Sequence, residues 1–218
     1  MLHNVTYINS KGENKRIEFA NDFTFIAGRN GSGKTTLIKA IRHFVENRHI
    51  DENGIKNINI QKSSDKCELI YYAPLEADAV NITEEGWWHM VEAIGKDKEK
   101  STELTESIIR VLSDSEYTCH IEGRSLLLVH PTGYVQNLKP EPTPNAFAGI
   151  AYLLACFHYY KNKNVLLLCD LPETRIHIGC QRMLIRELTQ GKNPNMQIII
   201  ATHSPAIISN HTFNLRHM

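Results

Sequence analysis

Residues Gly28 to Thr35 have the types and spacing that bind a chain of phosphates. They read GRNGSGKT and fit the pattern GxxxxGK[ST] completely. Glycines let such a loop wrap phosphate groups with inward N–H groups, a lysine contacts the β- and γ-phosphates, and a Thr hydroxyl ligates Mg²⁺. The candidate binding residues are Gly28, Arg29, Asn30, Gly31, Ser32, Gly33, Lys34, Thr35 and Thr36. The alternative is a glycine-rich turn without a ligand.

A second motif supports the first. The run VLLLCD is a hydrophobic strand that ends in an acid, Asp170. In a nucleotide site with a P-loop, such a carboxylate holds Mg²⁺ through water. Asp170 could instead cap a helix or begin a turn before Pro172. Together the two motifs predict ATP and Mg²⁺ as ligands, with Thr35 and Asp170 on the metal.

The elements around these motifs alternate between strands and helices. FTFIA (23–27) precedes the loop as a buried strand, and TLIKAIRHFVENR (36–48) follows it with helical spacing of apolar residues. Further strands are expected at 5–9, 16–20, 68–74, 117–123, 124–130, 165–170 and 196–204, and helices at 84–94, 104–112, 147–160 and 180–190. Residues 51–65 predict a loop or edge ribbon. Residues 95–103 are a charged stretch between two expected helices, and 95–100 are turn-prone. The pattern predicts an α/β fold with a mainly parallel sheet.

Composition narrows the class of protein further. Of 218 residues, 24 are Lys or Arg and 24 are Asp or Glu, so no global field attracts the chain to nucleic acid or an anionic membrane. The five cysteines lack metal or CxxC spacing and predict reduced structural thiols in a cytoplasmic protein. No segment has the pattern of a signal peptide or a membrane span.

Taken together, the motifs resemble the ABC-type ATPases of the RecF, SMC and OLD group. The opening hairpin with FTFIAGRNGSGKTTLIKAI is similar to their N-terminal lobe, DLPETRIH to their Walker B and D-loop segment, and IIIATHSPAII to their switch strand. The likeness covers about residues 1–45 and 145–210. It implies a three-layer P-loop NTPase fold, that of an ABC ATPase head, over one domain of residues 1–218. An N-terminal antiparallel β lobe and a small inserted lid at 75–140 complete this expectation.

The resemblance also assigns roles to single residues. His203 would sense the γ-phosphate, although it could be a structural histidine, and Glu173 matches the second acid of the family's Walker B pattern. The family places a glutamate, the general base, where this chain has Leu171, and leucine cannot accept a proton. In the signature segment AFAG (146–149), Phe147 replaces a serine. No glutamine follows the strand at 68–74, where Leu75 and Glu76 stand.

These departures leave more than one function open. The first hypothesis is an ATP-driven conformational or assembly switch that hydrolyses ATP slowly or with a partner. The second is a nucleotide-sensing subunit with little intrinsic hydrolysis, and a transporter-type subunit is the third. The resemblance implies a nucleotide-sandwich dimer with itself or a related head, a possible separate nuclease or effector subunit, and roles in DNA repair or phage defence. Nucleic acid would be bound only through the complex, and no membrane is involved.

Overall fold

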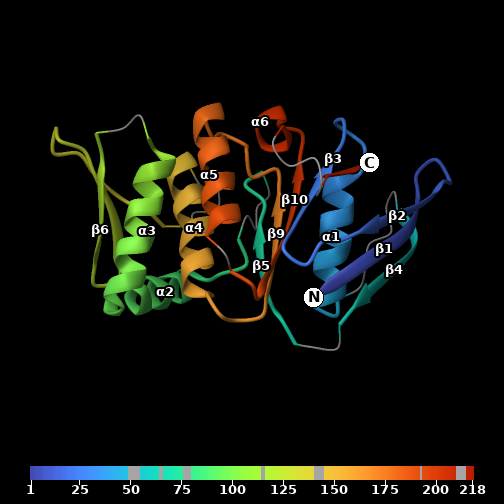
Figure 1. The fold of residues 1–218 in the computed structure, drawn as a ribbon, viewed down its shortest axis with the longest axis horizontal. Helices are drawn as coiled ribbons and strands as arrows, with labels where there is room; N and C mark the ends of the chain where they lie inside the picture. Colours follow the sequence, from blue (N-terminus) through green and yellow to red (C-terminus); the bar gives the residue numbers. More distant parts are fainter. Residues whose placement is uncertain are drawn as a thin grey trace. The chain divides into compact units, whose positions relative to one another are not determined.

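A computed structural model describes residues 1–48, 55–63, 66–75, 80–113, 116–139, 145–191, 193–209 and 215–218. The chain divides into two compact units (Figure 1). The first unit comprises Met1–Ala73, Asn162–Pro172 and Pro194–Met218, and the second comprises Pro74–Lys161 and Glu173–Asn193. None of the described helices is long and apolar enough to cross a membrane.

A five-stranded parallel sheet is the centre of the first unit. Its order is β11 (Leu215–His217), β3 (Phe23–Ala27), β10 (Met196–Thr202), β9 (Val165–Asp170) and β5 (Glu68–Tyr72), and every neighbouring pair is parallel. The inner strands β9 and β10 are buried along their whole length, which explains their continuous apolar runs. Four of these strands agree with the sequence prediction. Strand β11 and the short helix α6 (Pro205–Ile208) were not predicted.

The N-terminal segments form a separate antiparallel sheet. Its order is β2 (Asn14–Glu18), β1 (Leu2–Asn9) and β4 (Ile55–Lys62). The predicted antiparallel lobe is therefore present, and the polar stretch expected as a loop or edge ribbon contributes the edge strand β4. The remainder of that stretch, 51–54 and 64–65, lies outside the described residues.

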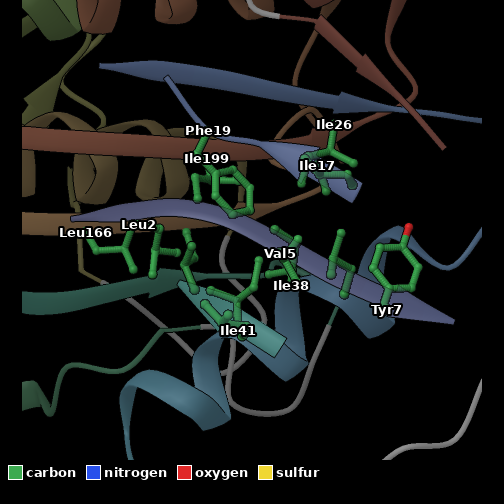
Figure 2. Close-up of a cluster of buried hydrophobic side chains, with 14 of the residues drawn as sticks. Leu2, Val5, Tyr7, Ile17, Phe19, Ile26, Ile38, Ile41, Leu166 and Ile199 are labelled. Atoms are coloured by element: carbon green, nitrogen blue, oxygen red, sulfur yellow. The ribbon is translucent and has the colours of Figure 1, made fainter. Parts of the chain in front are cut away.

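Helix α1 (Lys34–Val45) shares one apolar core with both sheets of this unit. Figure 2 shows Ile38 and Ile41 of this helix among side chains of the antiparallel sheet, such as Val5, and of the parallel sheet, such as Ile199. Ile38, Ile41, Val5 and Ile199 are fully buried. This core fixes the start of α1, and therefore the phosphate loop before it, against the end of β3.

A buried glutamine joins the two sheets. Gln197 of β10 is fully buried; its Oε1 accepts from the N–H of Leu2 (2.8 Å), and its Nε2 donates to the carbonyl oxygens of Leu2 (2.9 Å) and Ala20 (2.7 Å). These contacts link positions 195 and 177 residues apart. Gln197 therefore satisfies backbone groups of the N-terminal segment that would otherwise be buried without partners.

We expect Gln197→Met to reduce the free energy of unfolding by about 2–4 kcal/mol, because it removes three hydrogen bonds and leaves buried backbone groups unsatisfied. Denaturant unfolding followed by circular dichroism measures the change. The matched control is Gln190→Met on exposed helix surface, which should alter stability by less than about 0.5 kcal/mol. Equal effects of the two substitutions would contradict this role.

The second unit combines helices with a small antiparallel sheet. Its elements are α2 (Glu84–Lys96), α3 (Lys98–Val111), β6 (Thr118–Glu122), β7 (Ser125–Val129), β8 (Val135–Asn137), α4 (Ala146–Tyr159) and α5 (Ile178–Gln190). The hairpin predicted at 117–130 is present as β6 and β7, and β8 was not predicted. The role of 75–140 as a lid stays a prediction.

The charged stretch at 95–103 differs from expectation, because residues 95–100 were expected to be turn-prone. It is helical except at Asp97, which ends α2 and begins α3. The Asp97 side chain accepts from the N–H of Lys100 (3.2 Å) and so caps α3. Lysine and glutamate are good helix formers, so a single capping residue suffices to separate two helices here.

Charged and polar side chains connect α3, α4 and α5 within this unit. Arg110 donates from Nε and Nη2 to the two carboxylate oxygens of Glu187, both at 3.0 Å. The ring of His158 lies 3.3 Å from Ser107 Oγ and 3.4 Å from Glu103 Oε2. Burial lowers the pKa of His158, although Glu103 acts in the opposite direction, so the neutral ring is favoured.

Candidate functional site

The phosphate loop connects β3 directly to α1. At Gly28 a Cβ atom would lie 2.6 Å from Ser32 Oγ and 3.1 Å from the backbone oxygen of Met218, so a side chain there would require its neighbours to move. Gly33 has φ of 93°, in the left-handed region that favours glycine. The Lys34 ammonium donates to the carbonyl oxygens of Gly28 (2.8 Å) and Arg29 (3.1 Å). The loop thus folds back over the lysine that the sequence assigned to phosphate binding.

Two local features make the loop suitable for an anion. The Ser32 hydroxyl is buried and has no hydrogen-bond partner among the described residues. At the start of α1, Gly33 provides no side-chain cap, and the first turn has no acidic residue. An uncapped helix N-terminus presents N–H groups and a partial positive charge, which favours phosphate. The residues of the loop are therefore suited to bind the triphosphate group of a nucleotide.

The sheet register brings the other predicted groups to the same edge. Thr202 pairs with Ala27, and Ala201 pairs with Asp170, so β3, β10 and β9 end at nearly the same level. Asp170 is the last residue of β9 and is 5% exposed. His203 directly follows β10 and is exposed. The carboxyl ends of adjacent parallel strands are where open α/β sheets bind ligands.

A divalent cation would find few protein ligands at this edge. No group of three or more His, Cys, Asp or Glu side chains that could hold a metal ion occurs among the described residues. Asp170 and the half-buried Thr35 are the candidates that the sequence named. This fits Mg²⁺, which usually keeps several waters and takes its remaining ligands from one or two protein groups and the nucleotide phosphates.

A cavity of about 680 Å³ opens beside the phosphate loop. It is lined by Tyr7, Asn9, Ser10, Lys11, Glu13, Lys15, Gly28, Arg29, Asn30, Gly31, Ser32, Gly33, Thr36, Ile55, His217 and Met218. Six of the loop's predicted residues and Thr36 thus face one space, whereas Lys34 and Thr35 are not part of its lining. The sequence did not predict the lining residues from β1, β2, β4 and the C-terminal segment. No local motif marks these residues, because only the fold brings them beside the loop.

The position of the expected general base has an unusual backbone. Leu171 has φ of 52°, and its N–H donates to the carbonyl oxygen of Ala201 (2.9 Å). A left-handed conformation costs a non-glycine residue of order 1–3 kcal/mol, so the packing of β9 and β10 must hold it. Leucine there offers no group that could orient or deprotonate water.

Glu173 and Phe147, two further positions that the resemblance singled out, lie in the second unit. Glu173 is 7% exposed, and its backbone carbonyl accepts from the N–H of Ile176 (3.0 Å) and from Gln181 Nε2 (3.3 Å). Phe147 lies in the first turn of α4, with its ring centroid 5.7 Å from that of Tyr117. The roles of Glu173, Asp170 and His203 in chemistry stay predictions.

The glutamine expected after β5 is absent among the described residues at that place. Leu75 is 64% exposed, and Glu76 lies outside the described residues. The earlier Gln61 lies in β4, where its Oε1 accepts from Asn4 Nδ2 (2.7 Å). Its side chain is thus part of the antiparallel sheet.

Comparison with known proteins gives the class of this chain. Residues 4–123, more than half of the chain, match the family described as AAA ATPase domain, so the chain belongs to this family. No curated protein matches it in sequence. The fold is that of P-loop NTPases, as in SMC head domains and ATP-binding cassettes.

Three solved structures illustrate the likeness. An SMC head domain from Pyrococcus furiosus, bound to the C-terminal domain of ScpA, is 10% identical with a TM-score of 0.62; the match covers 96% of this chain and 91% of that one. The SMC head domain from Thermotoga maritima is 15% identical with a TM-score of 0.53, covering 95% and 91%. A nucleotide-free ATP-binding cassette from an ABC transporter is 14% identical with a TM-score of 0.50, covering 100% and 88%. At these identities the likeness concerns the fold alone.

Proposed function

We propose that this chain is an ATP-binding switch subunit that uses Mg²⁺ and associates with a second ATPase head when ATP is bound. The observation that carries the proposal is the sheet register, which brings the phosphate loop, Asp170 and the start of the segment after Thr202 to one edge of the parallel sheet. Lys34 would bind the β- and γ-phosphates, and Thr35 and Asp170 would position the cation. His203 would contact the γ-phosphate.

The bound cation would neutralise charge on the phosphates as the terminal bond breaks. The residues of the chain would bind and orient the nucleotide, but Leu171 provides no general base. This favours slow or partner-dependent hydrolysis. An intrinsically inactive nucleotide sensor is the second candidate, and the left-handed Leu171 together with Phe147 at the start of α4 favours it.

The partner would be a second copy or a related head, forming a nucleotide sandwich. A separate nuclease or effector subunit, and nucleic acid bound through that complex, would place the chain in DNA metabolism or phage defence. Support comes from the resemblance to SMC-like proteins and from the fold shared with an SMC head that binds ScpA. A transporter role has less support, because the segment IIIATHSPAII and the N-terminal lobe resemble the RecF-like branch.

Nucleotide-dependent assembly gives the direct test. We expect the chain to elute with a larger mass in ATP and Mg²⁺ than in ADP or buffer, because a sandwich dimer buries the γ-phosphate between two heads. Light scattering after gel filtration measures the mass, and phosphate release is followed in the same samples. A mass that is unchanged by ATP, at concentrations where calorimetry shows saturation, would remove the self-association part of the proposal.

A further inference from the structure

A second cavity lies among the helices of the second unit. It has a volume of about 460 Å³ and is lined by side chains of α3, α4 and α5 and of the segments that follow α4 and α5. These three helices pack against one another, and Figure 1 shows them side by side. All the described residues that line the cavity belong to this one unit. The proposed nucleotide function makes no use of this cavity, although its volume suits a small-molecule ligand.

Three side chains at this cavity are arranged as acid, histidine and serine. His158 Nε2 lies 3.3 Å from Ser107 Oγ, and His158 Nδ1 lies 3.4 Å from Glu103 Oε2. Glu103 and Ser107 are four residues apart on α3, so both project from one face of that helix towards α4. Ser107 is 2% exposed and His158 is 8% exposed, and all three residues line the cavity. The same order of contacts activates the serine hydroxyl in acyl-transfer sites of unrelated folds.

The protonation state of His158 suits a general base. Burial lowers the pKa of His158; Glu103 and Glu187 act in the opposite direction, and Lys161 adds to the lowering. The neutral ring, which can accept the proton of Ser107, is therefore favoured at neutral pH. Lys161 Nζ donates to both carboxylate oxygens of Glu103, at 3.1 Å each, and so fixes this carboxylate beside the histidine ring.

Arg110 provides positive charge beside the serine. Its Nη2 donates to Ser107 Oγ (3.0 Å), and its Nε and Nη2 bind the Glu187 carboxylate. A cation at this position stabilises the negative charge that develops on a carbonyl oxygen when Oγ attacks. Glu187 competes for the Ser107 proton. Burial raises the pKa of Glu187, but hydrogen bonds from Arg110 and Ser107 outweigh burial and lower it, so this carboxylate is a weak base and His158 is the proton acceptor.

We propose that Glu103, His158 and Ser107 form an acyl-transfer site that hydrolyses small carboxylic esters. Ser107 Oγ attacks the carbonyl carbon, and its proton passes to His158 Nε2 and then to the alcohol oxygen as the ester C–O bond breaks. Water then attacks the acylated serine, with His158 taking and returning its proton, which releases the carboxylic acid and restores the hydroxyl. One ester and one water thus give one acid and one alcohol. Glu103 acts through His158 and is a positioning residue.

The walls of the cavity define the class of ester. Phe157 is buried and Met183 is half-buried, and both present apolar surface to the cavity. The acyl group packs against these two side chains, because burying its apolar surface there is favourable. A cavity of about 460 Å³ limits this group to a short chain.

Covalent labelling of the full chain with a fluorophosphonate tests the proposal. The reagent forms a P–O bond with a nucleophilic serine and releases fluoride, while the base takes the serine proton. We expect one adduct per chain by mass spectrometry, on the peptide that contains Ser107, and none in Ser107→Ala. The matched control is Ser113→Ala in the exposed turn after α3, which should be labelled like the unmodified chain. An unmodified Ser107, or the same adduct in Ser107→Ala, would overturn the proposal and leave the proposed nucleotide function unaffected.

The pH dependence of labelling distinguishes a reactive site from a polar network that only joins helices. The rate in the unmodified chain should rise with pH, with a midpoint below 6.5, because the neutral form of His158 is the base and its pKa is lowered. His158→Gln should slow labelling by about 10²–10⁴-fold and remove this dependence. Glu103→Gln should move the midpoint to lower pH, since Glu103 raises the pKa. A labelling rate of the unmodified chain that is constant between about pH 5 and 8 would overturn the role of His158, whether or not the variants fold.

Hydrolysis of p-nitrophenyl butyrate measures the complete reaction. We expect p-nitrophenolate release by the unmodified chain, with an initial burst from acylation of Ser107. Ser107→Ala should lose at least about 10²-fold in rate, whereas Ser113→Ala should keep the full rate. Thermal unfolding of both variants shows that they are folded under the assay conditions. Equal hydrolysis by Ser107→Ala and the unmodified chain, or none by either, would refute ester hydrolysis at this site.

Discussion

Leu171→Glu is expected to accelerate ATP hydrolysis by the isolated chain by about 10²–10⁴-fold, the usual contribution of a general base. The substitution restores a carboxylate directly after Asp170, where the resemblance to ABC-type ATPases expects it. The N–H of Leu171 is already bonded to Ala201, so the backbone at this position is held by the sheet edge. Phosphate release at saturating ATP and Mg²⁺ measures the rate.

The control for this substitution is Leu171→Gln. Glutamine is polar and has the same length as glutamate, but it cannot take a proton at neutral pH. It should leave hydrolysis as slow as in the unmodified chain. Comparable rates for the Glu and Gln variants would exclude base catalysis from this position. A chain that turns over briskly without any change would point to Glu173 or Glu76 as the base, and the sensor hypothesis would then be dropped.

Phe147 provides a second test of why ATP hydrolysis by this chain is expected to be slow. Phe147→Ser would supply the hydroxyl that the resemblance expects at the start of α4, and its ring contact with Tyr117 would be lost. Because both groups act on one transition state, the double change with Leu171→Glu should exceed either single change and need not be additive. A double variant no faster than Leu171→Glu alone would show that Phe147 does not limit ATP hydrolysis.

Lys34→Ala has the second large expected effect, a loss of about 10–150-fold in ATP affinity. A charge-assisted phosphate contact contributes roughly 1.5–3 kcal/mol, which corresponds to that range. Calorimetry with ATP and Mg²⁺ measures the affinity. The matched control is Lys39→Ala on the exposed side of the same helix, which should bind ATP normally.

The lysine also contacts its own loop, so stability must be measured beside affinity. Lys34 Nζ donates to the carbonyl oxygens of Gly28 and Arg29. Removing this side chain therefore also destabilises the loop of the nucleotide-free protein. Thermal unfolding of Lys34→Ala in the absence of nucleotide separates the two effects. Unchanged ATP affinity in a folded Lys34→Ala variant would refute the assignment of the phosphate site.

Local patterns in the sequence were sufficient for the elements that hold the phosphate loop. A continuous apolar run before the loop predicted β3, and the 3.6-residue spacing after it predicted α1, because both signals come from neighbours within a few residues. The turn-prone stretch expected at 95–100 was predicted wrongly, because a single capping residue, Asp97, separates two helices there. Strand β11, with three residues, is too short to give a periodic signal.

Tertiary structure alone decided which distant residues join this site. Met218 reaches the loop because β11 pairs with β3, a contact across almost the whole chain, and Gln197 serves the backbone of Leu2 because two sheets pack together. The left-handed backbone of Leu171 is likewise fixed by its bond to β10. The sequence by itself determined the loop, its strand and its helix, since their chemistry is local. The cavity beside the phosphate loop depends on strand order and register, which arise only when non-local surfaces are buried together.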